Sequence, residues 1–334
     1  MQKETISVAV YSAHGNPADV LRVESRPWPR PEPDEVVVEM RAAPINPADL
    51  NAIEGKYPGK REVPAVPGFE GSGIVSELGQ NVSKLTIGSL VLLPHDIGTW
   101  REACAVKAEQ LVVVPPEVDP VQAAMLKINP LTAWRLLHGY VELKASDWVI
   151  QNAANSAAGR AVIQIAHALG YKTVNVVRRE ELIEELRTEG GGDVVLMDGE
   201  NLRDEVKKAT GGAPIHLGLN AVGGESALRL MNCLAASGTL VTFGAMSLQP
   251  LKIPNGLLIF KDLRFRGIWI NKWYDNATPA ERMAAFNPIF EMTGRGLLQT
   301  KVEKTYSLSE IKAAVEHAAR AQRRGKIIFE FGAH

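Results

Sequence analysis

The pattern of hydrophobic residues changes along the chain. Up to about residue 125 the apolar residues fall in short runs such as EVVVEM, GSLVLLP and QLVVVPP. Turn-forming residues separate these runs, and eleven of the 20 prolines lie within the first hundred residues. Short apolar runs bounded by proline and glycine predict a small, irregular β domain.

A second pattern begins after residue 130, since residues 131–213 contain no proline. Apolar runs here alternate with helical patterns that are mostly about 10 to 15 residues long. Strand, helix, strand in repetition predicts a parallel, doubly wound sheet, and the fold class is therefore α/β. The predicted strands are 148–153, 172–178, 193–197, 215–222, 238–244 and 263–270.

The segment after the first of these strands shows the period of a helix packed on a sheet. Its apolar residues recur at spacings of three and four, and Gly170 stands where a C-terminal cap belongs. The residues on this face are Ala158, Val162, Ile165, Ala166 and Leu169.

After Trp269 the pattern changes again, to a helix at 279–294, an amphipathic segment at 309–323 and a closing strand at 325–331. We expect these elements to return to the first domain, because a lone hairpin is marginally stable. The predicted division is a β-rich domain at 1–125, a Rossmann domain at 126–270 and a return segment at 271–334.

The turn after the first parallel strand is unusually poor in glycine. Asn152, Asn155 and Ser156 crowd it, and of the dinucleotide-binding pattern G-x-G-x-x-G only the last glycine, Gly159, is present. A helix N-terminus at this place offers free N–H groups to a pyrophosphate, and Asn and Ser side chains can add donors. The alternative is that Ser156 only caps its helix.

The second parallel strand ends in VNVVRRE, which places Arg178 nineteen residues after Gly159. An acidic residue near this place binds the ribose 2′-hydroxyl in NAD enzymes, whereas two arginines favour a 2′-phosphate. The predicted cofactor is therefore NADPH. Two alternatives stay open: Glu180 neutralises one arginine, or the group is a solvated charged cluster.

Composition and charge narrow the classes of function. With 37 basic and 38 acidic residues the net charge is −1, and neither a like-charge run nor a nucleic-acid motif is present. The sequence lacks a secretory signal and a membrane span, so we expect a soluble chain, complete at Met1. Cys104 and Cys233 support neither a disulfide framework nor a thiolate zinc site. We expect a bacterial-type cytoplasmic enzyme; a mature mitochondrial form also fits.

These features together resemble the medium-chain dehydrogenase/reductase superfamily, whose members pair a GroES-like catalytic domain with a Rossmann domain. The resemblance spans nearly the whole chain. Several segments look like the 2-enoyl thioester reductase branch: INPADLNAIEGKYP, KINPLTAWRLL, VIQNAANSAAG, VNVVRR, LNAVGGESA, GTLVTFGAMSLQP and LLIFKDLRFRGIWI.

The zinc-dependent alcohol dehydrogenases of the same superfamily differ at their metal ligands. Where they have Gly-His-Glu this chain has Gly68-Phe69-Glu70, and Asn46 stands in the region of their cysteine ligand. Phenylalanine cannot bind a metal, so we expect no metal site. A conjugated double bond can be reduced without a Lewis acid, through a hydrogen-bond donor on the carbonyl.

The resemblance implies hydride transfer to the β-carbon of a trans-2-enoyl thioester of coenzyme A or acyl-carrier protein. Tyr57, in the segment EGKYP, matches the family's candidate proton donor. A phenol is protonated near pH 7 and can both hydrogen-bond an enolate and deliver its proton. The alternative is an ordinary loop tyrosine.

The resemblance also implies cofactor contacts. Asn129 matches a position near the nicotinamide ribose, although it could instead stabilise the turn before Pro130. Arg178 matches the adenosine end, where Arg179 and Glu180 depart from the family pattern Arg-Asp-Arg. The implied phosphate contacts are Asn155, Ser156, Ala157 and Ala158, with backbone groups serving at the two alanines.

Further implied cofactor contacts lie at later strand ends. Alternative roles are core packing for Trp269 and a solvent-facing position for Lys326. The segment 263–270 is a candidate for pairing with its twin in a homodimer. The implied cofactor contacts at these later positions are Phe243, Gly244, Ala245, Met246, Ile268, Trp269, Ile270 and Lys326.

The rival functions are a zinc-free quinone or alkenal reductase and a non-catalytic NADPH-binding protein.

Overall fold

The computed structural model describes residues 4–59, 61–188, 192–321 and 323–332. Its contacts divide the chain into two units, Met1–Ile128 with Gln299–His334, and Asn129–Leu298. Among the described residues, no helix combines the length and the apolar character that crossing a membrane requires.

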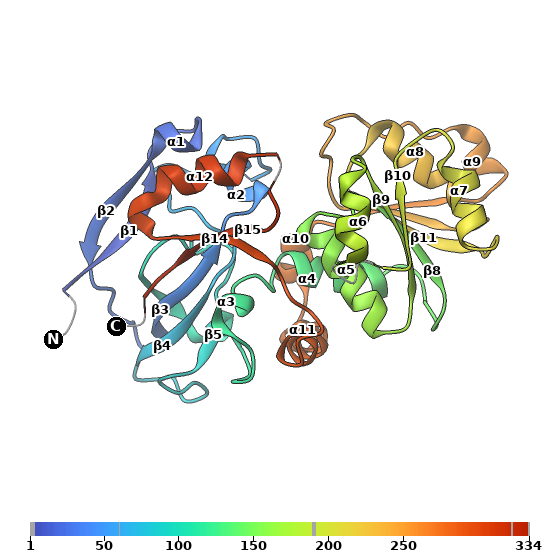
Figure 1. Cartoon of the computed structure of the whole chain (residues 1–334). Coiled ribbons are helices and arrows are strands. Elements are labelled where there is room, and N and C mark those ends of the chain that lie inside the picture. Colours follow the sequence, from blue (N-terminus) through green and yellow to red (C-terminus); the bar gives the residue numbers. More distant parts are fainter. Residues whose placement is uncertain (1–3, 60, 189–191, 322, 333–334) are drawn as a thin grey trace. The chain divides into compact units, whose positions relative to one another are not determined.

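The first unit is built on a seven-stranded sheet. Six strands follow the order β14-β15-β3-β4-β5-β7, and β6 pairs with β3. β15, from the end of the chain, pairs antiparallel with β3, so red and blue strands adjoin in Figure 1. The strands are β3 (Glu35–Pro44), β4 (Ser72–Leu78), β5 (Leu90–Leu92), β6 (Ala103–Lys107), β7 (Val112–Val113), β14 (Val302–Tyr306) and β15 (Lys326–Glu330).

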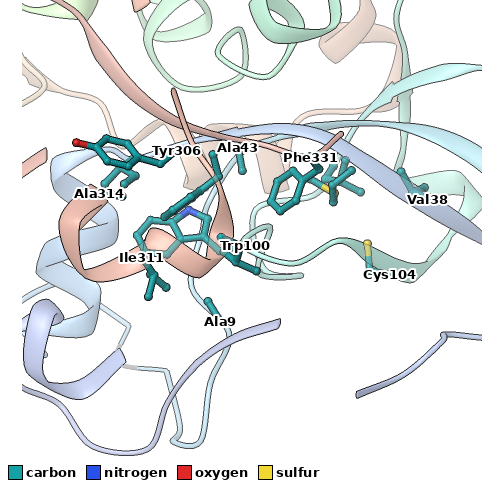
Figure 2. Packing of buried hydrophobic residues seen from close by; sticks show 14 of the residues in the cluster. Ala9, Val38, Ala43, Trp100, Cys104, Tyr306, Ile311, Ala314 and Phe331 are labelled. Carbon is teal, nitrogen blue, oxygen red and sulfur yellow. The ribbon is translucent and has the colours of Figure 1, made fainter. Parts of the chain in front are cut away.

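A two-stranded sheet and short helices complete this unit. Trp100 lies at the centre of its core, with its ring 5.1 Å from that of Phe329. Figure 2 shows Ile311 and Ala314 of α12 in the same cluster. The remaining elements are β1 (Thr5–Tyr11), β2 (Leu21–Pro27), α1 (Pro17–Val20), α2 (Pro47–Ile53), α3 (Pro120–Ala123), α12 (Ile311–Ala319) and two single 3₁₀ turns, Ala108–Gln110 and Leu308–Glu310.

The second unit contains a parallel six-stranded sheet in the order β10-β9-β8-β11-β12-β13. In chain order this is 3-2-1-4-5-6, the doubly wound Rossmann arrangement, so the predicted fold class is confirmed. The six predicted strands are confirmed too, with several ending earlier than predicted because the chain turns at the sheet edge. They are β8 (Trp148–Asn152), β9 (Lys172–Val177), β10 (Val194–Met197), β11 (Ile215–Asn220), β12 (Thr239–Thr242) and β13 (Arg264–Gly267).

The helices of the second unit include the two predicted at 158–169 and 279–294. Gly170 follows the first of them with φ 74°, the left-handed conformation of a helix end. The helices are α4 (Asn129–His138), α5 (Ala157–Ala168), α6 (Glu181–Thr188), α7 (Leu202–Ala209), α8 (Gly224–Cys233), α9 (Asn255–Ile259), α10 (Ile270–Asn276) and α11 (Pro279–Gly294).

The division differs from the predicted one at its second boundary. Residues 271–298 belong to the second unit, not to the return segment, because α11 packs against α4. Phe286, Ile289 and Phe290 of α11 are buried. The sequence pattern changes where the sheet ends, but the two helices that follow the last strand, α10 and α11, still bury apolar residues in the second unit.

Candidate functional site

The turn between β8 and α5 is compact and capped. The Ser156 hydroxyl oxygen accepts a hydrogen bond from the Gly159 N–H at 3.1 Å, so Ser156 is the N-cap. Its hydroxyl hydrogen can still serve a ligand. A Cβ on Gly159 would lie 2.5 Å from the Ala154 carbonyl oxygen, so only glycine fits this close approach. Ala157 and Ala158 begin the helix, where N–H groups lack intrahelical acceptors by position.

Asn152 has a structural role that differs from that of its neighbours in the turn. Its side chain is buried at the end of β8 and accepts from the Ala221 N–H at 2.7 Å. It donates to the side-chain oxygens of Asn220 at 2.9 Å and Ser226 at 3.0 Å. This network ties β8 to β11 at the point where the strand order reverses, the usual ligand-binding edge of such a sheet.

Asn152 and Asn220 illustrate what sequence analysis missed. Asn220 accepts from the N–H groups of Val222 at 3.1 Å and Gly223 at 3.0 Å, which fixes the loop after β11. The available signal was an amide residue at the end of a buried apolar strand, a place where an unpaired polar group would be costly. Asn155, by contrast, is only half-buried.

The arginine pair lies directly after β9. Arg179 pairs with Glu181 at 3.3 Å, and not with Glu180, the neutralising residue of the alternative interpretation. This pair is exposed and therefore weak. The Arg178 side chain is exposed, and within the described ranges its guanidinium makes no ion pair. Arg178 is thus available to an anionic group near the end of β9.

The predicted segment 243–246 lies along the same edge. Phe243 donates its N–H to the Asn220 carbonyl at 3.0 Å, and Met246 donates to Ala221 at 3.0 Å. Gly244 also approaches Ala221 closely, because an added Cβ would lie 3.0 Å from the Ala221 carbonyl oxygen. The Met246 side chain is 61% exposed. The segment therefore borders the Asn152 network and presents apolar surface outward.

The predicted residues around β13 and α4 occupy element ends. Ile268 donates its N–H to the Thr242 carbonyl at 3.1 Å, and Trp269 caps α10, which begins at Ile270. Trp269 is 44% exposed, so the alternative of core packing is wrong for it. Asn129 is the first residue of α4.

In the first unit Tyr57 lies just beyond α2. Its N–H donates to the Asn51 carbonyl at 3.2 Å, and its half-buried ring packs on Phe69 with the centroids 5.2 Å apart. The Arg61 guanidinium also lies over the Phe69 ring, 4.9 Å from its centroid. Tyr57 is therefore held by both its backbone and its ring.

Lys326 is buried, with 5% exposure, so the alternative of a solvent-facing lysine is wrong. Its ammonium donates to the Asn46 side-chain oxygen. Two fully buried carboxylates, Asp49 and Glu70, interact with it electrostatically. Burial lowers the pKa of Lys326 to about 8 and raises that of Asp49 to about 7.

Glu70 has several partners within this group. Its carboxylate accepts from the Asn46 side chain and from the Ile128 N–H, each at 2.8 Å. Burial raises the pKa of Glu70, while Lys326 and Lys127 oppose that shift. Sequence reasoning did not find this buried group, because hydropathy places charged residues at the surface.

The residues in the zinc-ligand region form no metal-binding arrangement. Phe69 packs on Tyr57, and Asn46 bonds to Glu70 and Lys326. Across the described parts of the chain, no three or more His, Cys, Asp or Glu residues are grouped to hold a metal ion. Burial raises the pKa of Cys104 to about 11 and that of Cys233 to about 12, which disfavours their thiolates.

Comparison with protein families gives two matches. The model described as alcohol dehydrogenase GroES-like domain matches residues 32–116, and the one described as zinc-binding dehydrogenase matches residues 157–285. The first lies within the first unit and the second within the second unit.

Curated relatives cover nearly the whole chain. A mitochondrial enoyl-[acyl-carrier-protein] reductase of Dictyostelium discoideum is 36% identical, over 96% of this chain and 93% of its own length. The enzyme of the same name from Rattus norvegicus is 39% identical, over 93% of this chain and 85% of its own.

Solved structures give the same picture. The complex of Etr1p with NADP and crotonyl-CoA has a TM-score of 0.88 and 29% identity, covering 98% of this chain and all of that one. A structure described as a putative NADPH:quinone reductase from Bacillus thuringiensis has a TM-score of 0.89 and 30% identity, covering 98% and 99%. With the relatives' full-length similarity, the chain belongs to the 2-enoyl thioester reductase family of the medium-chain dehydrogenase/reductase superfamily.

Proposed function

We propose that this chain catalyses the NADPH-dependent reduction of trans-2-enoyl thioesters to acyl thioesters. The observation that carries the proposal is its full-length similarity to enzymes named enoyl-[acyl-carrier-protein] reductases. The substrate is a thioester of coenzyme A or acyl-carrier protein, and the reaction belongs to fatty acid synthesis.

The residues of the second unit fit NADPH. Ser156 and the first N–H groups of α5 would hold the phosphates, with Gly159 permitting the tight turn. Arg178, exposed after β9, would bind the 2′-phosphate with its planar guanidinium. When bound, NADPH supplies the hydride that reduces the β-carbon.

Contacts along the rest of the cofactor complete the proposed site. Asn129 would bond near the nicotinamide ribose, and the two strand-end segments would line the cofactor. In the first unit Lys326 is the proposed basic contact. The other proposed contacts are Asn155, Ala157, Ala158, Arg179, Phe243, Gly244, Ala245, Met246, Ile268, Trp269 and Ile270.

Tyr57 is the proposed catalytic residue. Reduction at the β-carbon leaves negative charge on the thioester oxygen, and the α-carbon must gain a proton. The Tyr57 hydroxyl can donate a hydrogen bond to that oxygen and then deliver its proton. The double contact of Tyr57 with Asn51 and Phe69 supports this role, because a proton donor must be held in one orientation.

Reduction of quinones is a second candidate, favoured by the Bacillus thuringiensis neighbour. Initial rates of NADPH oxidation with crotonyl-CoA, its acyl-carrier-protein thioester and a quinone separate the two. We expect the thioesters to be the faster substrates. Faster turnover of the quinone would contradict the proposal, and binding of NADPH with no turnover would indicate a non-catalytic protein.

We also propose a homodimer and a location. β13 lies at the edge of its sheet with β12 as its neighbour, and a structure described as an Etr1p/Etr2p heterodimer supports association through the family fold.

The curated relatives are named as mitochondrial, which supports a mitochondrial location over the expected cytoplasmic one. Fractionation of source cells tests the location.

A further inference from the structure

The carboxylate of Asp49 bonds to two distant parts of the first unit. One oxygen accepts from the Asn46 N–H at 2.7 Å and so closes the first turn of α2. The other accepts from the Phe69 N–H at 2.9 Å, twenty residues further along the chain. The side chain is 1% exposed, so water does not replace either partner.

Two other capping boxes in this chain show that the second bond is not part of ordinary capping. In the boxes Thr278–Glu281 and Ser307–Glu310, one carboxylate oxygen accepts from both the backbone and the hydroxyl of the N-cap residue. Both glutamates are exposed. Asp49 differs because it is buried and reaches across to Phe69.

Phe69 and α2 both contact Tyr57. The Tyr57 ring packs on Phe69 at an interplanar angle of 43°, and its N–H bonds to Asn51 near the end of α2. Asp49 therefore links Phe69, which contacts the Tyr57 ring, to α2, which accepts from the Tyr57 backbone N–H. Loss of its carboxylate would leave two buried N–H groups without an acceptor.

The surrounding charges allow Asp49 to remain in this place. Lys326 interacts electrostatically with both Asp49 and Glu70, and Lys127 interacts electrostatically with Glu70. Both lysines and both carboxylates are at most 5% exposed. Two basic side chains thus accompany two acidic ones in the same buried group, which offsets the cost of burying either kind alone.

We propose, on the basis of the function proposed above, that Asp49 is a positioning residue that orients Tyr57 through Phe69. Asp49 is not within the described contacts of Tyr57 itself and acts through another side chain. The residue fixes the proton donor while the charges around it stay balanced.

Reduction of crotonyl-CoA by NADPH tests this with the whole chain carrying Asp49→Asn, Tyr57→Phe, or both. Asparagine keeps the size but replaces one acceptor oxygen with an NH2 group, which donates and cannot accept. We expect kcat to fall about tenfold in Asp49→Asn, with KM for NADPH within about twofold. In the Tyr57→Phe background the further loss should be below about twofold. An equal loss in both backgrounds would overturn the inference.

Glu310→Gln is the matched control, because it weakens a capping box of the same unit that has no bond to Phe69. Its kcat should stay within about twofold of the parent. If Asp49→Asn does not fold, Phe69→Leu replaces it, since it leaves the charged group intact and removes the ring beneath Tyr57. Phe69→Leu with an unchanged rate would also overturn the inference.

A second readout separates this inference from the proposed function. The six tyrosines are replaced by 3-fluorotyrosine, and the ¹⁹F resonance absent from Tyr57→Phe is assigned to Tyr57. Asp49→Asn should shift or broaden that resonance, and Glu310→Gln should not. An unchanged resonance overturns the inference whatever the rates, whereas an inactive parent protein overturns the proposed function alone.

Discussion

At the scale of single residues, buried polar side chains were the hardest to predict. Tyr57 was proposed through the family resemblance, and Arg178 through its position after the second parallel strand. Nothing in the sequence indicated that Lys326 is buried, because whether a lysine faces solvent depends on what packs over it. Asn46, to which Lys326 donates, lies 280 residues away in the chain, beyond any local pattern.

Arg178→Ala should weaken the binding of NADPH by about ten- to a hundredfold and leave that of NADH nearly unchanged, because a charge-assisted contact with the 2′-phosphate is lost. Fluorescence titration with both cofactors measures the effect. Arg179→Ala is the control, with a smaller loss expected because that guanidinium already pairs with Glu181. Equal weakening of both cofactors would contradict the role of Arg178.

Lys326→Met should destabilise the protein without cofactor by about 3–5 kcal/mol at pH 7.5, because it leaves Asp49 and Glu70 buried without their cation. A carboxyl with a raised folded-state pKa takes up a proton on folding. Its stability penalty is therefore small near its unfolded pKa and fully present above its folded pKa, about 7 for Asp49.

The loss of unfolding free energy caused by Lys326→Met should accordingly be smaller at pH 5.5, where protonation of the buried carboxylates removes much of their charge. Urea unfolding of both proteins at the two pH values measures this difference. Lys304→Met, which alters an exposed lysine of β14, is the control and should show little change. A loss that grows as the pH falls would contradict the assigned charges.

At the scale of elements, periodicity predicted well where one face is apolar. The spacing of apolar residues predicted α5, and the alternation of short apolar runs with helical patterns predicted the six strands. Strand ends were less predictable, because Ala153 and Val222 continue an apolar run after the chain has turned at the sheet edge. The capping role of Ser156 was visible in the sequence, but the join between β8 and β11 was not.

Asn152→Ala should destabilise the protein by about 1–3 kcal/mol, since the buried Ala221 N–H would lose its acceptor. The affinity for NADPH should fall as well, because the edge formed by β8 and β11 would loosen. Urea unfolding and cofactor titration measure the two effects. Asn155→Ala, at a half-buried position, should affect binding more than stability; the reverse pattern would contradict these assignments.

At the scale of the whole molecule, the sequence predicted two folding units and the return of the C-terminal strand. It placed the second boundary too early, because two helices after the last strand still bury apolar residues in the second unit. The exposed side chains at the end of α9 have no apolar cover in the described chain: Ile259 is 70% and Phe260 85% exposed. They lie just before the edge strand β13.

Phe260→Glu should shift the proposed homodimer towards monomer by at least about tenfold in dissociation constant, because a charge would be buried at an apolar contact. Light scattering after size-exclusion chromatography, over a range of concentrations, measures the shift. Ile87→Glu, at another exposed apolar position, is the control. A mass unaffected by Phe260→Glu would remove this surface from the proposed interface.

The pairing of β15 with β3 has a consequence for biosynthesis. β3 leaves the ribosome almost 300 residues before its partner strand, whereas every strand of the second unit is made in one uninterrupted stretch. The second unit is therefore expected to fold before β15 has been made, and the sheet of the first unit is completed later. Nascent chains stalled before residue 326 should bury the Rossmann strands yet leave the β3 edge open to chaperones.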